Sequence, residues 1–337
     1  MKDGKRKFLG DPRAATPTKI MLQALAVSFV MLLVGLGPCA AQTKPPAIDI
    51  RNDLRNDASS AVANQLPNPH SISAAGAAST SNEDAAAENE LLEAANKSRE
   101  LAGAPQLRMD ESLREAARAH ALRMVASDRL EHQLPGELSL LERIAQVGSP
   151  DSPLHDSLKK ALKVDRAGEN IAHATCALGA NDALMRSAPH RQNLLDRGFN
   201  VAGIAAIWSK GRLYVVQDFA REVPSYSAEQ SRKLIARSVD DVRQQAGLQE
   251  LGQVSPPNLD EAACKLAKEN RPNAHLLATA YSNRKIIAYT ESHPETLPAG
   301  ALPLLRDPGV RQFAIGSCYA RNAVYPTGMY WVAILLY

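Results

Sequence analysis

Aromatic residues and cysteines are scarce in this sequence. Aromatic side chains make up 4% of the 337 residues, and the chain has four cysteines. Because it has so few cysteines, the chain cannot be a disulfide-dense scaffold. Buried apolar side chains must therefore hold the fold together. Apolar residues still make up 45% of the chain, with alanine abundant among them. We therefore expect helices that pack through small side chains.

A large excess of one charge is also missing. The formal net charge is +3, and the basic residues of the first 41 positions account for it, so the remaining chain is close to neutral. A near-neutral chain gives no electrostatic reason to expect nucleic-acid binding. The sequence also lacks a serine or cysteine nucleophile elbow, a phosphate-binding loop and a His-Glu-x-x-His segment. The sequence therefore carries none of the usual local signatures of serine hydrolases, nucleotide hydrolases or zinc peptidases.

The N-terminus predicts export. A basic stretch precedes an uncharged apolar run over residues 20–37, and small residues lead to a cleavage site after Ala41. Residues 1–41 are therefore interpreted as a signal peptide, and the protein as secreted, periplasmic or bound to the cell envelope. The run is also just long enough to cross a bilayer, so an uncleaved anchor formed by residues 20–37 is the alternative.

Composition and periodicity divide the remaining chain. Residues 42–86 carry prolines among alanine, serine, asparagine and aspartate, which predicts a disordered linker. Residues 87–222 begin with two amphipathic helices, the second capped by Asp110, and end with β-type runs at 201–208 and 213–219. Residues 133–166 are polar and interrupted, so they are expected to be irregular. Helices followed by a hairpin predict an α+β domain.

Three stretches of this domain recur in the same order near the C-terminus. Residues 99–107 match 243–251, residues 113–117 match 259–263, and residues 211–215 match 328–332. With the Leu194-Leu195 pair matched to Leu304-Leu305, the connecting segment of the second copy is about half as long. Residues 223–337 are therefore predicted to be a truncated, degenerate repeat of residues 87–222.

The second copy contains two of the cysteines. Cys264 lies on its predicted second helix and Cys318 on its predicted strand. They are expected to form a disulfide if that helix packs on that strand, which requires their Cα atoms to lie within about 7 Å.

Residues that suit a binding or catalytic site gather in the first copy. Two imidazoles, His132 and His190, and one carboxylate, Glu169, suit a divalent metal such as zinc or general acid–base chemistry. His120 falls on the apolar stripe of the second helix and is interpreted as a satisfied core histidine. The second copy has no counterpart of the three residues.

The segments around these residues resemble the bacterial SCP-like branch of the CAP superfamily (cysteine-rich secretory and pathogenesis-related proteins). The resemblance rests on Ala-His-Ala-x-x-Met at 119–124, His132, Ala-Gly-Glu-Asn-Ile-Ala at 167–172, and Ser-Ala-Pro-His-Arg-x-Asn-Leu-Leu at 187–195. It implies an α-β-α sandwich with a surface cleft that holds two histidines and two acids. On that pattern His132 and His190 can hold a divalent cation, and Glu169 is the first acid.

The sequence departs from this pattern at the second acid. Ser187 stands at the acidic position, and Leu184 replaces the tryptophan of the preceding helix. The loss puts a hydrolytic mechanism based on all four residues in doubt.

Three functional hypotheses follow. The first is a non-enzymatic binding or interaction module, whose partner is a cell-envelope polymer, a lipid or sterol-like ligand, or a protein. It has no role with nucleic acid, and it meets a membrane only through an uncleaved N-terminal segment. The second is a metal-dependent, peptidase-like hydrolase with His132 and His190 on the metal and Glu169 as general base. The third is structural, in which the second copy packs on the first to form a rigid two-lobed protein.

Overall fold

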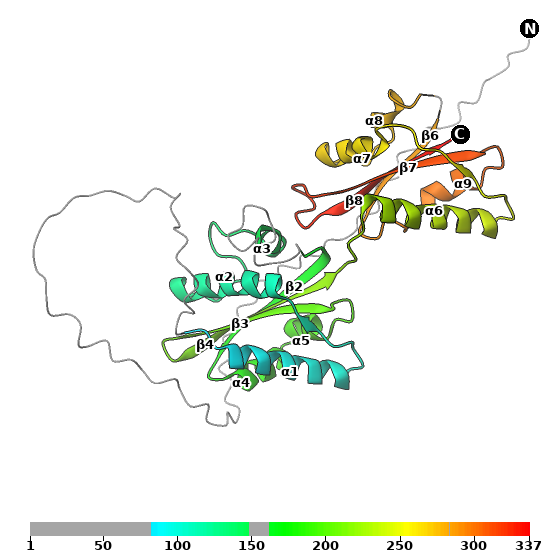
Figure 1. Ribbon diagram of the computed structural model, residues 1–337. Coiled ribbons are helices and arrows are strands. Elements are labelled where there is room, and N and C mark those ends of the chain that lie inside the picture. The colour runs from blue at the N-terminus through cyan, green and yellow to red at the C-terminus, as the bar shows by residue number, and fades with distance from the viewer. Residues whose placement is uncertain (1–81, 148–161, 283) are drawn as a thin grey trace, which may run out of the picture.

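The chain folds into two lobes of similar construction. Figure 1 shows the computed structural model, which describes residues 82–147, 162–282 and 284–337. Each lobe is a four-stranded sheet with helices on both faces, so the predicted α+β class is confirmed. Residues 1–41 and all but the end of the 42–86 linker lie outside the described residues, so the predicted signal peptide and anchor do too. No helix within the described ranges is long and apolar enough to cross a membrane.

The first lobe contains five helices and four strands within the described residues. One face of its sheet carries α2 and α3, and the other carries α1, α4 and α5 (Figure 1). The strand order is β1-β3-β4-β2, with β1 parallel to β3 and the other pairs antiparallel. The bounds are α1 Ala85–Leu101, β1 Arg108–Met109, α2 Glu111–Ser127, α3 Leu140–Val147, β2 Val164–Ala174, α4 Ala177–Arg186, α5 Ala188–Leu195, β3 Val201–Ser209 and β4 Arg212–Glu222.

The second lobe has the same strand arrangement. Its order is β5-β7-β8-β6, again with the first pair parallel and the others antiparallel. α7 and α8 cover one face of the sheet, and α6 and α9 cover the other (Figure 1). The bounds are α6 Ala228–Gln245, β5 Gly252–Gln253, α7 Leu259–Lys268, α8 His275–Ala278, β6 Lys285–Glu291, a 3-10 turn at Ala299–Ala301, α9 Leu302–Leu305, β7 Gln312–Ala320 and β8 Met329–Leu336.

The helix α2 forms as its sequence predicts. The Asp110 side chain accepts hydrogen bonds from the backbone N–H groups of Ser112 and Leu113, which caps the first turn. The predicted apolar stripe from Leu113 to Met124 is fully buried against the sheet. A Cβ atom at Gly203 of β3 would lie 2.1 Å from the Leu113 carbonyl carbon, so only glycine lets the helix approach this closely.

Two elements occur where an irregular segment was expected. Residues 133–166 contain α3 and the start of β2. α3 is only two turns long, too short to show a periodic pattern. β2 is buried on both faces around Asn170 and Ile171, so its residues do not alternate between apolar and polar. α1 also begins earlier than expected, because Asp84 accepts a hydrogen bond from the Ala87 N–H and caps it.

A buried arginine has the same role in each lobe. In the first, Arg99 donates hydrogen bonds to the carbonyl oxygens of Leu194 and Asp196. In the second, Arg243 donates to those of Leu305 and Asp307. Each guanidinium thereby satisfies carbonyl groups where the chain leaves a helix, which makes its burial tolerable. The two arginines make Leu194 equivalent to Leu305. The sequence match had paired Leu194 with Leu304, so the alignment of the repeats shifts by one residue here.

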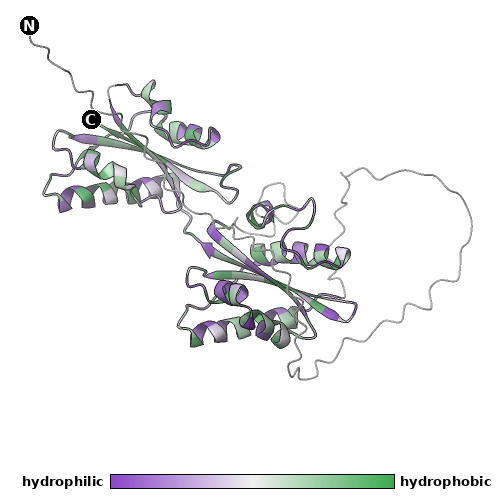
Figure 2. Cartoon of the chain, turned by 180° about the vertical axis from the view of Figure 1, so that it is seen from behind, coloured by the Kyte–Doolittle hydropathy of each residue, from purple (hydrophilic) through white to green (hydrophobic). Residues whose placement is uncertain are grey.

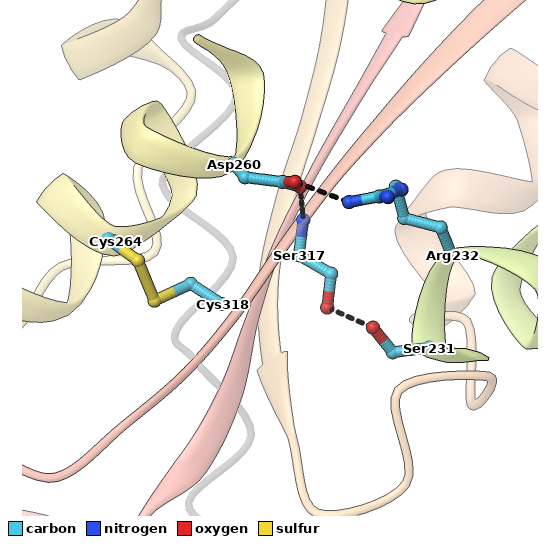
Figure 3. Close-up of a disulfide and its surroundings, with 6 residues drawn as sticks. All are labelled: Ser231, Arg232, Asp260, Cys264, Ser317 and Cys318. Carbon is cyan, nitrogen blue, oxygen red and sulfur yellow. Dashed lines mark hydrogen bonds and ion pairs between the residues drawn. A yellow bond between two sulfur atoms is a disulfide. The ribbon is translucent and has the colours of Figure 1, made fainter. Parts of the chain in front are cut away.

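An ion pair between two helices occurs in both lobes with its charges exchanged. In the first lobe Glu88 of α1 pairs with Arg114 of α2 at 2.8 Å. In the second, Arg232 of α6 pairs with Asp260 of α7, as Figure 3 shows. In each lobe the carboxylate also accepts a backbone N–H from the third strand of the lobe, from Ala206 to Glu88 and from Ser317 to Asp260. The ion pair therefore occupies the same position in both lobes, but its acid lies on the first helix of the first lobe and on the second helix of the second lobe.

The core of the second lobe centres on β8. Every residue of this strand is buried, because helices cover both faces of the sheet. Figure 2 shows hydrophobic residues along the strands of this lobe, while its helices alternate between hydrophilic and hydrophobic residues. Cys264 of α7 and Cys318 of β7 form a disulfide with Cα atoms 5.2 Å apart, which confirms the predicted pairing (Figure 3).

Removal of this disulfide should destabilise the second lobe. The bond closes a loop with a sequence separation of 54 residues, for which the loop-closure entropy removed from the unfolded chain corresponds to about 4 kcal/mol. We expect the double variant Cys264→Ser, Cys318→Ser to unfold at correspondingly lower urea concentration. Each lobe contains one tryptophan, so emission from Trp331 in a Trp208→Phe background reports the second lobe alone. An unchanged urea midpoint would show that the disulfide does not stabilise the lobe.

Candidate functional site

The structure brings the three predicted site residues together. His132 lies in the loop after α2, Glu169 is in the middle of β2, and His190 is in the first turn of α5. His132 Nδ1 lies 2.8 Å from Glu169 Oε1. The rings of His132 and His190 are stacked, with centroids 6.5 Å apart.

Two asparagines fix the helix that carries His190 against the strand that carries Glu169. Asn170 Nδ2 donates to the His190 carbonyl oxygen at 3.1 Å, and Asn193 Nδ2 donates to the Glu169 carbonyl oxygen at 3.1 Å. The His190 ring is oriented by a hydrogen bond of 2.7 Å between its Nδ1 and Ser187 Oγ. The asparagines of the Gly-Glu-Asn and Pro-His-Arg-x-Asn segments therefore position the site.

An arginine that the sequence did not indicate is the principal cation of the site. Arg143 of α3 forms an ion pair through Nη2 with Glu169 Oε2, and its Nη1 donates to the His132 carbonyl oxygen at 3.2 Å. The side chains of Arg143 and Glu169 are 6% and 5% exposed. A buried guanidinium with these partners neutralises the carboxylate and holds the His132 loop.

His120 belongs to the same buried cluster. Its Nδ1 lies 2.9 Å from Glu137 Oε1, as expected of a satisfied core histidine. Its Nε2, however, lies 3.9 Å from Glu169 Oε2 and has no hydrogen-bond partner among the described residues. His120 is fully buried and only partly satisfied, so the interpretation from the sequence holds for one ring nitrogen alone.

A further acid of the site is Asp218 of β4. It lies directly opposite Glu169 in the β2–β4 ladder and is fully buried. Its carboxyl group has its hydrogen-bond partner in the neighbouring carboxyl group of Glu169. The family pattern has its second acid at the position of Ser187, where a hydroxyl group bonds to His190, so Asp218 is an additional acid that the sequence did not indicate. An aspartate in the middle of the apolar run 213–219 was the signal that could have found it.

Burial shifts the protonation of the cluster. It raises the pKa of Glu169 to about 7, against the lowering effect of the Arg143 charge. Burial and the neighbouring Glu169 raise the pKa of Asp218 well above its ordinary value. Two adjacent buried carboxyl groups therefore share a proton near neutral pH.

The two site imidazoles shift in the opposite direction. Burial lowers the pKa of both His132 and His190, and the Arg143 charge lowers that of His132 further. Both rings are consequently neutral at pH 7, the form that binds metals and accepts hydrogen bonds.

The predicted metal ligands fit a metal only in part. No three His, Cys, Asp or Glu side chains in the described part of the chain are arranged to hold an ion. Glu169 faces Nδ1 of His132, so it can orient that ring but leaves Nε2 as the ligand atom. Two imidazoles on one tetrahedral ion would have centroids about 5 Å apart, closer than observed. As they lie, the two imidazoles are farther apart than two ligands of one tetrahedral ion.

The site reaches the surface through its histidines. The His132 side chain is 30% exposed and His190 is half-buried, whereas the carboxyl groups lie beneath them. Among the hollows in the described part of the surface, one lies over α5 and another between the lobes. Neither of these two is lined by His132, Glu169 or His190.

The second lobe lacks the site. In the first lobe the Asn200 N–H donates to the Ala220 carbonyl oxygen, and in the second the Arg311 N–H donates to the Tyr337 carbonyl oxygen. These matching bonds make Ala220 of β4 equivalent to Tyr337 at the end of β8. Counting along the strands from these bonds places Leu335 at the position of Asp218 and Ile286 at that of Glu169. Two apolar side chains thus replace the carboxyl pair.

Comparisons with known proteins agree with the fold. Residues 92–219 match the model of the family described as CAP, the cysteine-rich secretory protein family. Residues 92–219 are therefore identified as a CAP domain, as the resemblance in the sequence implied. A search of curated proteins finds no match.

Several solved structures share limited similarity. An extracellular SCP-domain protein from Bacillus anthracis is 22% identical with a TM-score of 0.34 and covers 41% of each chain. An outer surface protein from Borrelia burgdorferi is 15% identical with a TM-score of 0.35, over 42% of this chain and 97% of its own. A cysteine-rich secretory protein from Staphylococcus aureus is 17% identical with a TM-score of 0.29, over 43% and 40%. This chain therefore spans about two fifths of the Bacillus protein's length.

Replacing Asp218 with its neutral isostere should stabilise the protein at high pH. An ordinary aspartate in the unfolded chain ionises near pH 4, whereas burial holds the native carboxyl protonated to much higher pH. The native state therefore loses stability as pH rises above about 4. We expect Asp218→Asn to gain on the order of 1–2 kcal/mol at pH 8 and almost nothing at pH 4. Urea unfolding of both proteins at the two pH values measures this. A variant that is less stable at pH 8 would mean that Asp218 is ionised and paired with Arg143.

Proposed function

We propose that this chain is an exported CAP protein that acts as a non-enzymatic binding module at the cell envelope or outside the cell. The observation that carries the proposal is the state of Glu169. Its carboxylate is buried, bonded to His132 and neutralised by Arg143, while the exposed edge of the site consists of two neutral imidazoles. Such a surface can accept hydrogen bonds or a cation, but it offers no free carboxylate to an approaching substrate.

The hydrolase alternative receives less support from this geometry. A general base must reach the proton that it removes, directly or through one water. The pKa of Glu169, raised by burial to about 7, would suit such a base. The side chain, however, is 5% exposed and lies beneath the His132 ring with both oxygens engaged. A substrate could reach it only if the His132 ring moved away from Glu169.

Export is supported by the N-terminal sequence and by the family. The basic stretch, the apolar run and the small residues before Gln42 have the order of a signal peptide. The partner classes that fit an exported binding module are a cell-envelope polymer, a lipid or sterol-like molecule, or another protein. Pull-down on purified peptidoglycan and on lipid vesicles would separate the first two.

We further propose that residues 223–337 are a degenerate CAP-like repeat. The common strand order, the equivalent buried arginines and the exchanged ion pair support a duplicated domain. The apolar residues at the positions of Glu169 and Asp218 support the loss of its site.

Within the first lobe, His132 and His190 are proposed to bind a divalent cation such as zinc weakly. Two imidazole ligands give a site with open positions, so calorimetric titration at pH 7.5 should show a single weak event. Binding should fade only below about pH 6, because burial lowers the pKa of both rings and keeps them unprotonated.

The matched controls distinguish this site from other histidines. The double variant His132→Ala, His190→Ala should lose the binding event, whereas His173→Ala should keep it. His173 lies on β2 in the same lobe, but its ring packs edge-on against Tyr214. Zinc binding that survives in the double variant would exclude the imidazole pair as the site.

A further inference from the structure

The two lobes contact each other through the loop that joins β7 to β8, residues 321–328, here called the β7–β8 loop. Arg321 Nη1 donates a hydrogen bond to the Ala145 carbonyl oxygen of α3 at 3.1 Å. Thr327 Oγ1 donates a buried hydrogen bond of 2.7 Å to the Val164 carbonyl oxygen, at the start of β2. Both acceptors lie on elements that build the site, since α3 supplies Arg143 and β2 supplies Glu169.

Aromatic residues of the second lobe add a third contact. Lys163, immediately before β2, places Nζ 3.4 Å from the centroid of the Tyr319 ring and 5.3 Å from that of Tyr330. These rings pack edge-to-face with centroids 5.0 Å apart and form a platform for the ammonium group. The hollow between the lobes is lined by Leu141 of α3 and by most of the β7–β8 loop. The second lobe therefore touches the segments on both sides of the 148–161 gap.

The helix α3 needs such support. It has eight residues, too few for a helix to be stable without tertiary contacts. Only Arg143 and Ile144 among them are buried. The carbonyl groups of its last turn have no partner within the helix, and the helix dipole makes that end negative. Arg321 supplies both a donor and a positive charge there.

We propose that the second lobe is an intramolecular brace that keeps Arg143 in the site, with Arg321 as the positioning residue. Arg321 does not touch Glu169 or the histidines, and it acts through α3. The lobe that lacks a site of its own thereby maintains the ion pair that neutralises Glu169 in the other. The second lobe supports α3 in the ligand-free protein, and this support does not depend on what the site binds.

Hydrogen–deuterium exchange of the full chain, read by mass spectrometry, tests the brace. We expect peptides of α3 to exchange roughly threefold to tenfold faster in Arg321→Ala, the effect of losing one hydrogen bond. Peptides of β8 should be unchanged. Arg321→Lys keeps a charged donor and should restore part of the protection. The matched control is Arg311→Ala, since Arg311 bonds to the Pro308 carbonyl within its own lobe and should leave α3 unaffected.

Chemical labelling of Arg143 shows whether its side chain is released. This side chain is 6% exposed, so phenylglyoxal should modify it slowly in the parent protein. In Arg321→Ala its rate of modification should rise by the same factor as α3 exchange. Faster exchange with Arg143 still protected would overturn the proposal, because the brace would then not position Arg143.

Two further outcomes would also overturn it. One is an unchanged α3 in Arg321→Ala. The other is an equal acceleration of exchange in both lobes, which would reflect general destabilisation. If Arg321→Ala does not fold, Arg321→Gln removes the charge and keeps a shorter side chain that can donate a hydrogen bond, and α3 exchange and Arg143 labelling are read in that variant.

Discussion

The buried ion pair between Arg143 and Glu169 is the interaction on which the site depends. Neither side chain reaches bulk water, and a buried charge without its partner would cost about 3–5 kcal/mol. The pair also sets the properties of its neighbours. Glu169 orients His132, and the guanidinium holds the His132 loop. Burial, helped by the guanidinium charge, lowers the pKa of that imidazole. The carboxyl group of Asp218, pressed against Glu169, gives the cluster a proton that it can share.

The interactions that stabilise the fold are different from the residues that form the site. In both lobes a buried arginine satisfies the carbonyl groups at the end of a helix, and a pair of opposite charges joins the helices on the two faces. These features occur with and without a site, so they belong to the fold. The carboxyl pair and the histidines occur in the first lobe only, among the described residues, and they depend on α3. In the second lobe the short helix α8 takes the place of α3 between α7 and β6, but it has four residues and carries no arginine.

Much of the fold could be predicted from the sequence, because local signals were strong. The capped, amphipathic α2, the β3–β4 hairpin and the Cys264–Cys318 bond follow from residue patterns over short distances. The convergence of His132, Glu169 and His190 came from a family resemblance, since no spacing rule joins residues so far apart. Arg143 and Asp218 were missed for physical reasons. One is carried by a two-turn helix without a periodic pattern, and the other is an acid within a buried strand, where composition alone predicts an apolar side chain.

The exchanged ion pairs have a consequence for how a tandem protein assembles. Duplicated domains are prone to misfolding in which a helix of one copy packs on the sheet of the other. Here α1 in contact with α7 would bring Glu88 against Asp260, and α6 in contact with α2 would bring Arg232 against Arg114. Each wrong combination sets like charges side by side in a partly buried position, whereas each correct one joins opposite charges. The reversal of one charge pair therefore favours the packing of each helix in its own lobe over its packing in the other lobe.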